Sequence, residues 1–306
     1  MNRILVTGSK GQLANDVFDF FSNSPFELIG KTHNQLDITN LDSVVREVSR
    51  EEPNWIINCA AYTDLDAAES NARLAFEVNF EGPRNLAEVS SSYNIGLIHI
   101  STDAVFSSEL PIYFDVSEKP NPINVYGVSK VLGEQAIRDL AKKYWILRSS
   151  WIYGHKGSKY FNSVLTKIRN SQNIDVVTDQ YGQPTPTFML SSAIREIVSN
   201  KIDIGTHHIV PSEYISRYEF CLKIKQAYEL VNDKISKSHI SRIVTKRSNF
   251  LAPRTKYSLL RPSEFIHLAP TSQDSSLDRI IEVMRMRERS GGLEARGERN
   301  RRIGDS

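Results

Sequence analysis

The sequence predicts an α/β protein built on a Rossmann-type, doubly wound parallel sheet, with a smaller substrate-binding domain in its C-terminal half. Two observations carry this prediction. Short apolar runs alternate with amphipathic stretches over the first 150 residues, and a glycine-containing turn follows the first apolar run. Strands separated by helices build parallel sheets, because the chain needs a long crossover to return to the same edge. The length of 306 residues allows one or two domains.

The first half contains the elements of the sheet. Strands are expected at 3–7, 26–31, 55–60, 96–100 and 145–149, and helices at 12–21, 41–51, 72–93 and 125–143. The strands are short buried-type runs, whereas the helical segments repeat apolar residues about every 3.6 positions. Asn40 or Asp42 is a suitable residue to open the second helix. We assign residues 1–150 to a dinucleotide-binding domain.

The pattern changes after residue 150. Gly182, Pro184 and Pro186 form a loop-like cluster, and helices are then expected at 190–200 and 217–232, with a strand at 207–210. We assign 151–286 mainly to a substrate-binding domain that exchanges segments with the first domain. Residues 287–306 are rich in Arg, Glu and Gly with almost no large apolar residue, which predicts a disordered tail.

Charge and composition exclude several classes of protein. The net charge is +2, and residues 285–306 contribute seven arginines against three glutamates and one aspartate, so the body is near neutral. A near-neutral body does not favour nucleic acid or a membrane surface as partner. No apolar run approaches the length of a membrane span, and no signal-peptide pattern is seen. Only two cysteines occur, as in buried thiols of a reducing compartment. We expect a cytoplasmic protein.

The turn after the first strand has the features of a dinucleotide site. Gly8, Gly11 and Ala14 stand three residues apart at the start of the first helix. Glycines at such a turn let the backbone approach a diphosphate, whose charge is met by amide groups and the helix dipole. Taken alone, the motif is equally a simple strand-to-helix turn.

The end of the second strand bears on the choice of cofactor. Dinucleotide folds that select NAD usually place a carboxylate there, but this chain has Lys31, followed by Thr32 and His33. The absence of a carboxylate, with Lys31 available for a 2′-phosphate, favours NADP, and NAD is left open. Lys31 could equally be a solvated surface charge. Asp37 is a candidate for the adenine end.

Tyr126 and Lys130 are candidates for acid-base chemistry. Their spacing of four places both on one face of the helix expected at 125–143. We expect the Lys130 ammonium to lower the pKa of the Tyr126 phenol, which would donate a proton to a substrate oxygen as hydride arrives. Thr102 follows the strand at 96–100, where a substrate-binding hydroxyl belongs, with Ser101 as the alternative. Capping and turn roles explain each of these residues singly, but not their joint order.

These motifs together resemble the dTDP-4-dehydrorhamnose reductase family, a branch of the extended short-chain dehydrogenases. The similarity covers roughly residues 2–285 and also includes Asp66, Glu69 and the segments 150–153 and 179–185. The resemblance implies catalysis by Thr102, Tyr126 and Lys130 and substrate contacts by Thr102, Asp103 and Trp151. The cofactor contacts that the resemblance implies come from Gly8, Gly11, Gln12, Leu13, Asp37, Ile38, Ala60, Ala61, Tyr62, Tyr126 and Lys130.

The function expected from this resemblance is reduction of the 4-keto group of a nucleotide-linked 6-deoxyhexose by NADPH or NADH, for synthesis of a surface polysaccharide. Two alternatives remain: an epimerase or reductase on another sugar nucleotide, and a non-catalytic NADP-binding regulatory subunit. Ala104 and Tyr257 replace a Tyr and an Asn usual in the family, which leaves the exact sugar open. A homodimer is also left open, and no metal site is predicted.

Overall fold

The computed structural model describes residues 2–156, 158–247, 250–264 and 275–289. Its centre is a six-stranded sheet of order β2-β1-β3-β4-β6-β9, in which every neighbouring pair is parallel. The strands are β1 (Asn2–Thr7), β2 (Phe26–Lys31), β3 (Trp55–Asn58), β4 (Gly96–Thr102), β6 (Tyr144–Ser149) and β9 (Gly205–His208). The chain winds outward in one direction to β2 and in the other to β9, so the predicted doubly wound α/β fold is confirmed.

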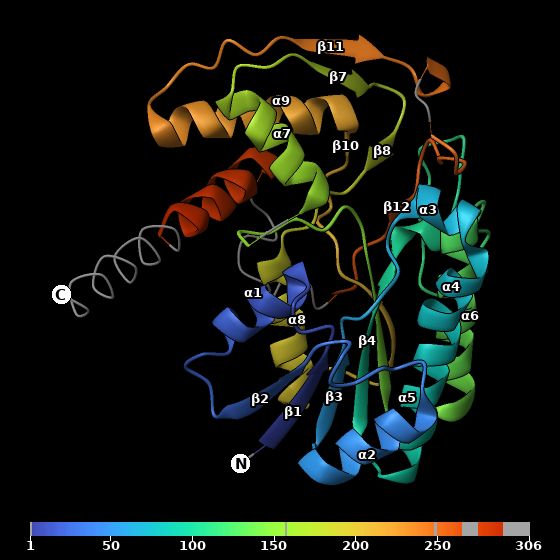
Figure 1. The fold of residues 1–306 in the computed structure, drawn as a ribbon. Helices are drawn as coiled ribbons and strands as arrows, with labels where there is room; N and C mark the ends of the chain where they lie inside the picture. The colour runs from blue at the N-terminus through green and yellow to red at the C-terminus, as the bar shows by residue number, and fades with distance from the viewer. Residues whose placement is uncertain (1, 157, 248–249, 265–274, 290–306) are drawn as a thin grey trace, which may run out of the picture.

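Helices cover both faces of the sheet, as Figure 1 shows. One face carries α1 (Gln12–Phe20) and α8 (Thr187–Val198), and the other carries α2 (Leu41–Glu51), α5 (Gly82–Ser92) and α6 (Val125–Leu140). Strand β1 shows why two layers form. Ile4 and Val6 pack in the core under α1 and α8, whereas Leu5 between them packs in the core under α2 and α5. Successive side chains of a strand point to opposite faces, so a strand that is apolar throughout must be covered twice.

The prediction of a single helix over 72–93 is wrong in one respect, because the observed helix is interrupted. It consists of α4 (Ala72–Phe76), a π-helical turn (Glu77–Glu81) and α5. Pro83 has no N–H to donate to the carbonyl of Asn79 four residues earlier, so the regular ladder cannot continue there. Helix α6 passes closely over the widened turn at Gly133, where a Cβ would clash with the Asn79 carbonyl oxygen.

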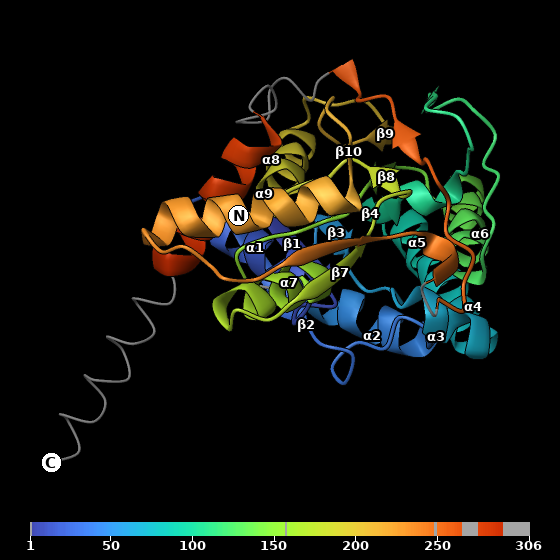
Figure 2. The same ribbon diagram turned by 90° about the horizontal axis from the view of Figure 1, so that it is seen from above.

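A second layer of structure lies beyond the carboxyl ends of the strands (Figures 1 and 2). It consists of α7 (Lys159–Arg169), β7 (Ile174–Val177), α9 (Arg217–Asn232), β11 (Ile240–Ile243) and a helix at 276–289. β7 pairs in parallel with β11, and short β8 (Tyr181–Gly182) pairs antiparallel with β10 (Ile215–Ser216). These helices and strands share a separate hydrophobic core. The sequence analysis foresaw α9 but not α7, β7 or β11.

Short segments connect the two parts. Helix α3 (Leu65–Ser70) follows β3, a 3₁₀ turn (Asp103–Val105) follows β4, and a second 3₁₀ turn (Thr245–Arg247) follows β11. β5 (Tyr113–Phe114) pairs with β12 (Leu259–Leu260) from near the C-terminal end. The carboxylate of Asp66 accepts hydrogen bonds from the backbone N–H groups of Leu251 and Ala252. Late segments therefore return to the first half, as α8 and β9 also do, and a domain division near residue 150 stays a proposal.

The tail predicted to be disordered lies mostly outside the described residues. Its first three residues, 287–289, are described and belong to the helix at 276–289, so the prediction is wrong for them. Arg287 is held there by donating a hydrogen bond of 2.5 Å to Asn162 on α7. Among the described helices, none is long and apolar enough to cross a membrane.

Candidate active site

The loops at the carboxyl ends of β1, β3, β4 and β6 bring the predicted residues to one edge of the sheet. The first of these loops fits a dinucleotide. Gly8 has φ +61°, and a Cβ there would lie 2.9 Å from the backbone of Ala60, so only glycine is accommodated. Gly11 caps α1 without any side-chain hydrogen bond, and Gln12 Nε2 is buried without a partner in the described chain. Free amide groups at a helix start provide the donors that a diphosphate requires.

The loop after β3 forms the adjoining wall. The backbone N–H of Tyr62 donates to Asn79 Oδ1 at 2.8 Å, and Asn79 Nδ2 donates to the Tyr62 carbonyl at 2.9 Å and to Ser129 at 3.0 Å. The π-helical turn thus places Asn79 where it ties the loop of Ala60, Ala61 and Tyr62 to α6. The sequence analysis missed Asn79, and its signal was Pro83 four residues later in an otherwise helical pattern.

Asp37 and Ile38 lie beside this wall. Asp37 Oδ1 accepts hydrogen bonds from the backbone N–H and the hydroxyl of Thr39. Ile38 is buried against Gly82, and its carbonyl accepts a hydrogen bond of 3.0 Å from Asn85. The local turn is therefore rigidly attached to α5. An adenine contact by Asp37 stays a prediction.

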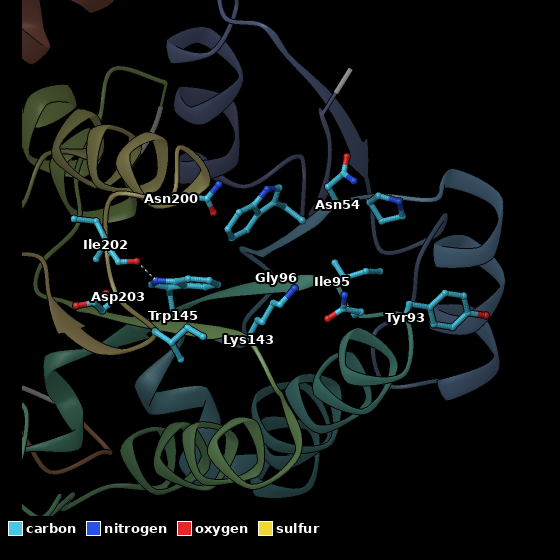
Figure 3. Close-up of a pocket in the computed structure, with 13 residues that line it drawn as sticks. Asn54, Tyr93, Ile95, Gly96, Lys143, Trp145, Asn200, Ile202 and Asp203 are labelled. Atoms are coloured by element: carbon cyan, nitrogen blue, oxygen red, sulfur yellow. Dashed lines mark hydrogen bonds between the residues drawn. The ribbon is translucent and has the colours of Figure 1, made fainter.

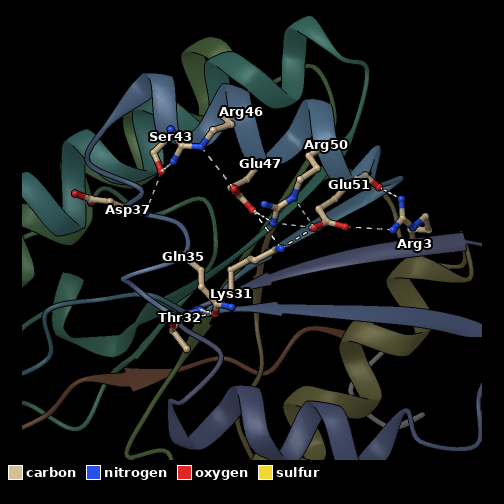
Figure 4. Close-up of polar contacts among 10 residues, drawn as sticks. All are labelled: Arg3, Lys31, Thr32, Gln35, Asp37, Ser43, Arg46, Glu47, Arg50 and Glu51. Carbon is tan, nitrogen blue, oxygen red and sulfur yellow. Dashed lines mark hydrogen bonds and ion pairs between the residues drawn. The ribbon is translucent and has the colours of Figure 1, made fainter.

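The prediction that Lys31 binds a 2′-phosphate is corrected by the structure (Figure 4). The Lys31 side chain is buried and its Nζ lies 2.6 Å from Glu51 and 3.2 Å from Glu47, both on α2. This contact is the leading cause of the lowered pKa of Glu51. A lysine paired with two carboxylates has no free charge to offer a phosphate. The sequence could not show this, because Glu47 and Glu51 are brought to Lys31 only by the packing of α2 on the sheet.

Lys130 ends a chain of buried polar contacts across the sheet. Its Nζ lies 2.9 Å from His99 Nε2 and donates to the carbonyl of Ile100 at 2.8 Å. His99 Nδ1 lies 2.9 Å from Asn58, which accepts a hydrogen bond of 2.6 Å from Thr7. Burial lowers the pKa of His99 well below its ordinary value and that of Lys130 to about 8. The sequence analysis missed His99, whose signal is a polar residue within the apolar run of β4.

The expected effect of Lys130 on Tyr126 is also corrected. Burial raises the pKa of Tyr126 to about 12, and a hydrogen bond with Thr102 only partly offsets this rise. The Lys130 amino group is directed to His99 and Ile100 instead of to the phenol. Tyr126 is therefore protonated at neutral pH, which is the form required to donate a proton.

Thr102 and Asp103 lie at the end of β4 next to Tyr126. Asp103 is buried, and its carboxylate accepts hydrogen bonds of 2.7 Å from Ser150 and Ser258 and one of 3.1 Å from Thr102. Burial raises its pKa, against the effect of these hydroxyls. Asp103 thus joins the ends of β4 and β6 to the segment before β12. Its carboxylate therefore positions the site from within, and the predicted substrate contact by Asp103 stays a prediction.

A buried ion pair holds α6, and with it Tyr126, against the sheet. Glu134 on α6 lies 2.7 Å from Arg148 on β6, and both side chains are almost fully buried. Glu134 also accepts a hydrogen bond of 2.6 Å from Ser101. Ser101, the alternative to Thr102, is therefore occupied beneath the site. Neither Glu134 nor Arg148 was singled out from the sequence.

Trp151 lies in the loop that follows β6. Its backbone has φ 44°, a left-handed conformation that is uncommon for a bulky residue and that concentrates at functional sites. A Cβ at Gly182 would lie 2.5 Å from the indole, so glycine is required beneath the ring. The Arg217 guanidinium lies 3.5 Å above the ring. The predicted substrate contact by Trp151 stays a prediction.

A cavity of about 630 Å³ lies at the opposite edge of the sheet (Figure 3). It is lined by the amino ends of the strands, including Trp55, Gly96 and Trp145, and by Asn200 and Ile204. Ligands of open parallel sheets bind beyond the carboxyl ends, where loops diverge and helix amino termini point. We therefore place the active site at the edge that carries Thr102, Tyr126 and Lys130.

The fold and the glycine turn are those of the class of Rossmann-type dinucleotide-dependent oxidoreductases, and Thr102, Tyr126 and Lys130 form the candidate site. Within that class, residues 1–286 match the family model "RmlD substrate binding domain", and the chain belongs to this family. The dTDP-4-dehydrorhamnose reductase of Aggregatibacter actinomycetemcomitans is 34% identical over 73% of this chain and 78% of its own length. The spore coat polysaccharide biosynthesis protein SpsK of Bacillus subtilis is 32% identical over 85% and 89%.

Solved structures agree with the sequence comparisons. The crystal structure of a dTDP-4-dehydrorhamnose reductase from Bacillus anthracis, in complex with NADP, superposes with a TM-score of 0.85 at 32% identity. The match covers 93% of this chain and 99% of that chain. The family inferred from the motifs is thereby confirmed.

Proposed function

We propose that this protein reduces the 4-keto group of a nucleotide-linked 6-deoxyhexose, with NADPH as the hydride donor, in the synthesis of a surface polysaccharide. The observation that carries the proposal is the meeting of Thr102 and Tyr126 at the carboxyl edge, beside a glycine turn with unmet donors. Membership of a family that contains dTDP-4-dehydrorhamnose reductases supports the same reaction. The bound NADPH supplies the hydride.

The residues of the chain divide the remaining work. Tyr126, protonated at neutral pH because it is buried, donates the proton to the ketone oxygen. Thr102, once its hydroxyl turns from Asp103, donates a hydrogen bond to the same oxygen and so stabilises the charge that develops there. We assign Lys130 to a ribose hydroxyl of the cofactor, which it would bind after leaving His99. Gly8, Gly11, Gln12 and Leu13 hold the diphosphate of the cofactor.

The 2′-phosphate requires other residues than Lys31. Ser9 and Thr32 are adjacent at the ends of β1 and β2, since the Ser9 N–H donates to the Lys31 carbonyl at 3.1 Å. Lys10, next to Ser9, is exposed and forms no ion pair in the described part of the chain. We assign the 2′-phosphate to Ser9 and Lys10, and to Thr32 once its hydroxyl leaves Gln35 Oε1, because hydroxyls and an unpaired ammonium are the groups that hold a phosphate.

The reaction is tested by following the absorbance of NADPH while the protein is mixed with a dTDP-4-keto-6-deoxyhexose generated in place. Stoichiometric loss of NADPH is expected. Conversion of the sugar without net loss of NADPH would identify an epimerase instead, and binding of NADPH without conversion of any sugar nucleotide would favour the regulatory subunit.

The cofactor assignment has its own test in the dissociation constants of NADPH and NADH, measured by fluorescence titration. Lys10→Ala should weaken NADPH about tenfold more than NADH, because one ion pair to the phosphate is lost. Lys31→Met is the matched control, and it should leave the ratio of the two constants unchanged. If Lys31→Met changes the ratio and Lys10→Ala does not, Lys31 binds the 2′-phosphate and the assignment to Lys10 is wrong.

Cytoplasmic location and a homodimer also remain proposals. The two cysteines, Cys59 and Cys221, are unpaired, and burial raises the pKa of both thiols to about 12. Such inert thiols are compatible with a reducing compartment. Size-exclusion chromatography with light scattering will give the oligomeric state.

A further inference from the structure

Arg217 differs from the other buried cations of the molecule. Lys31 and Arg148 each pair with a carboxylate, and Lys130 has polar partners in His99 and the Ile100 carbonyl. Arg217, the first residue of α9, instead lies between two aromatic rings, with its Cζ 3.5 Å from the centre of Trp151 and 4.8 Å from that of Tyr160. Within the described part of the chain, its guanidinium has neither an ion pair nor a hydrogen-bond acceptor.

The stacking leaves the polar edge of Arg217 available. A guanidinium contacts aromatic rings through its flat faces, whereas its five N–H donors lie in the plane. Stacking on Trp151 and Tyr160 therefore holds the group in place without using a donor. The residue is half-buried. Its guanidinium nitrogens have no hydrogen-bond partner among the described residues, and none of them is fully buried. The donors can reach a ligand.

Asp103 does not neutralise this charge at close range. Its two oxygens already accept hydrogen bonds from Ser150, Ser258 and Thr102. Burial lowers the pKa of Arg217 to about 10, and Asp103 lies near enough to oppose this shift in part. Arg217 is thus within electrostatic range of the residue that follows the predicted catalytic Thr102. The charge of Arg254, on a segment held by Asp66, has the opposite effect to Asp103 and lowers the pKa of Arg217 further.

An unpaired cation in a partly buried place is costly unless an anion completes it. We propose that Arg217 binds the phosphate bonded to the sugar in the nucleotide-sugar substrate. This inference rests on the proposed function for the nature of that substrate. The planar fork of arginine matches two oxygens of a phosphate, and its stacking on Trp151 fixes the phosphate relative to the ring expected to face the sugar.

The test compares ligands with and without phosphates. Dissociation constants of thymidine diphosphate, uridine diphosphate and guanosine diphosphate are measured by titration calorimetry, and the tightest is compared with its nucleoside. Arg217→Gln should weaken the nucleoside diphosphate by about 10- to 100-fold and leave the nucleoside unchanged, because only a phosphate contact is lost. Arg217→Lys keeps the charge but not the fork and should give an intermediate loss.

Arg242 provides a matched control. Its guanidinium also stacks on an aromatic ring, that of Tyr218 at 4.7 Å, but it lies on β11 and is exposed. Arg242→Gln should leave both affinities unchanged. If Arg217→Gln weakens the nucleoside and its diphosphate by the same factor, Arg217 acts only by supporting Trp151, and the inference is wrong.

The titration also separates this inference from the proposed function. Failure of the protein to oxidise NADPH with the chosen sugar leaves the binding of nucleoside diphosphates measurable. If the unaltered protein binds none of the three diphosphates, the inference falls as well.

Discussion

The two edges of the central sheet differ in how their polar groups are used. At the carboxyl edge, polar side chains from β1, β3, β4 and α6 converge in one buried network that includes His99 and Lys130. At the amino edge there is a cavity of about 630 Å³, but the indole N–H of Trp145 is already bonded to the Ile202 carbonyl. The presence of a cavity is thus a weaker indication of function than the convergence of polar groups whose protonation is shifted.

The largest effect is expected from the phenol at the carboxyl edge. Tyr126→Phe should lower kcat by about 10²- to 10⁴-fold at neutral pH, because the proton donor is lost while the ring still packs. Binding of NADPH, followed by its fluorescence, serves as the control and should be retained. Unchanged turnover in this variant would remove Tyr126 from the role of acid.

The next effect concerns the ion pair beneath that edge. Glu134→Ala should lower the free energy of unfolding by about 3–5 kcal/mol, because Arg148 is left buried and unpaired. Arg138 is the control, since it contacts the same carboxylate from a more exposed position, and Arg138→Ala should cost less than about 1 kcal/mol. Equal losses in the two variants, measured by chemical denaturation, would contradict the role of burial.

A smaller effect is expected from acidification. Burial lowers the pKa of His99 well below the ordinary 6.5 and that of His208 to about 4, so below pH 6.5 the unfolded chain binds protons that the folded protein does not. Stability should then fall by about 2 kcal/mol per pH unit between pH 6.5 and 5, with about 1 kcal/mol from each histidine.

One histidine opposes this trend. A hydrogen bond with Asp16 raises the pKa of His155. The stability that His155 contributes is therefore complete below pH 6.5 and is lost as the pH rises through the pKa of His155 in the folded protein. His99→Gln should flatten the slope measured by denaturation at several pH values. An unaltered slope in that variant would show that His99 is not the group responsible.

The smallest effect is expected at the amino edge. Ile204, which is 49% exposed at the rim of the cavity, can be replaced by Arg to place a charge there. Both kcat/KM and the melting temperature should stay near those of the unaltered protein, because an exposed substitution of this kind costs within about 0.5 kcal/mol. Loss of reductase activity without loss of stability would show that the amino edge takes part in function, and the contrast between the two edges would be wrong.

The sequence alone determined the fold class and the order of the motifs. Short apolar runs and period-3.6 patterns are local, so β1, β2 and α2 were predicted almost to the residue, and the glycine turn and the Tyr-Lys pair were found from spacing. Membership of the family also followed from motifs that lie within short windows.

Contacts between distant residues were decided only by the tertiary structure. Lys31 is drawn to Glu47 and Glu51, Lys130 to His99, and Arg217 to Trp151, and no local pattern specifies these pairs. The protonation of Tyr126 likewise depends on burial, which is set by packing. Charge and pKa respond to every group within several ångströms, whatever its place in the chain, so the chemistry of the site could be assigned only after folding brought those groups together.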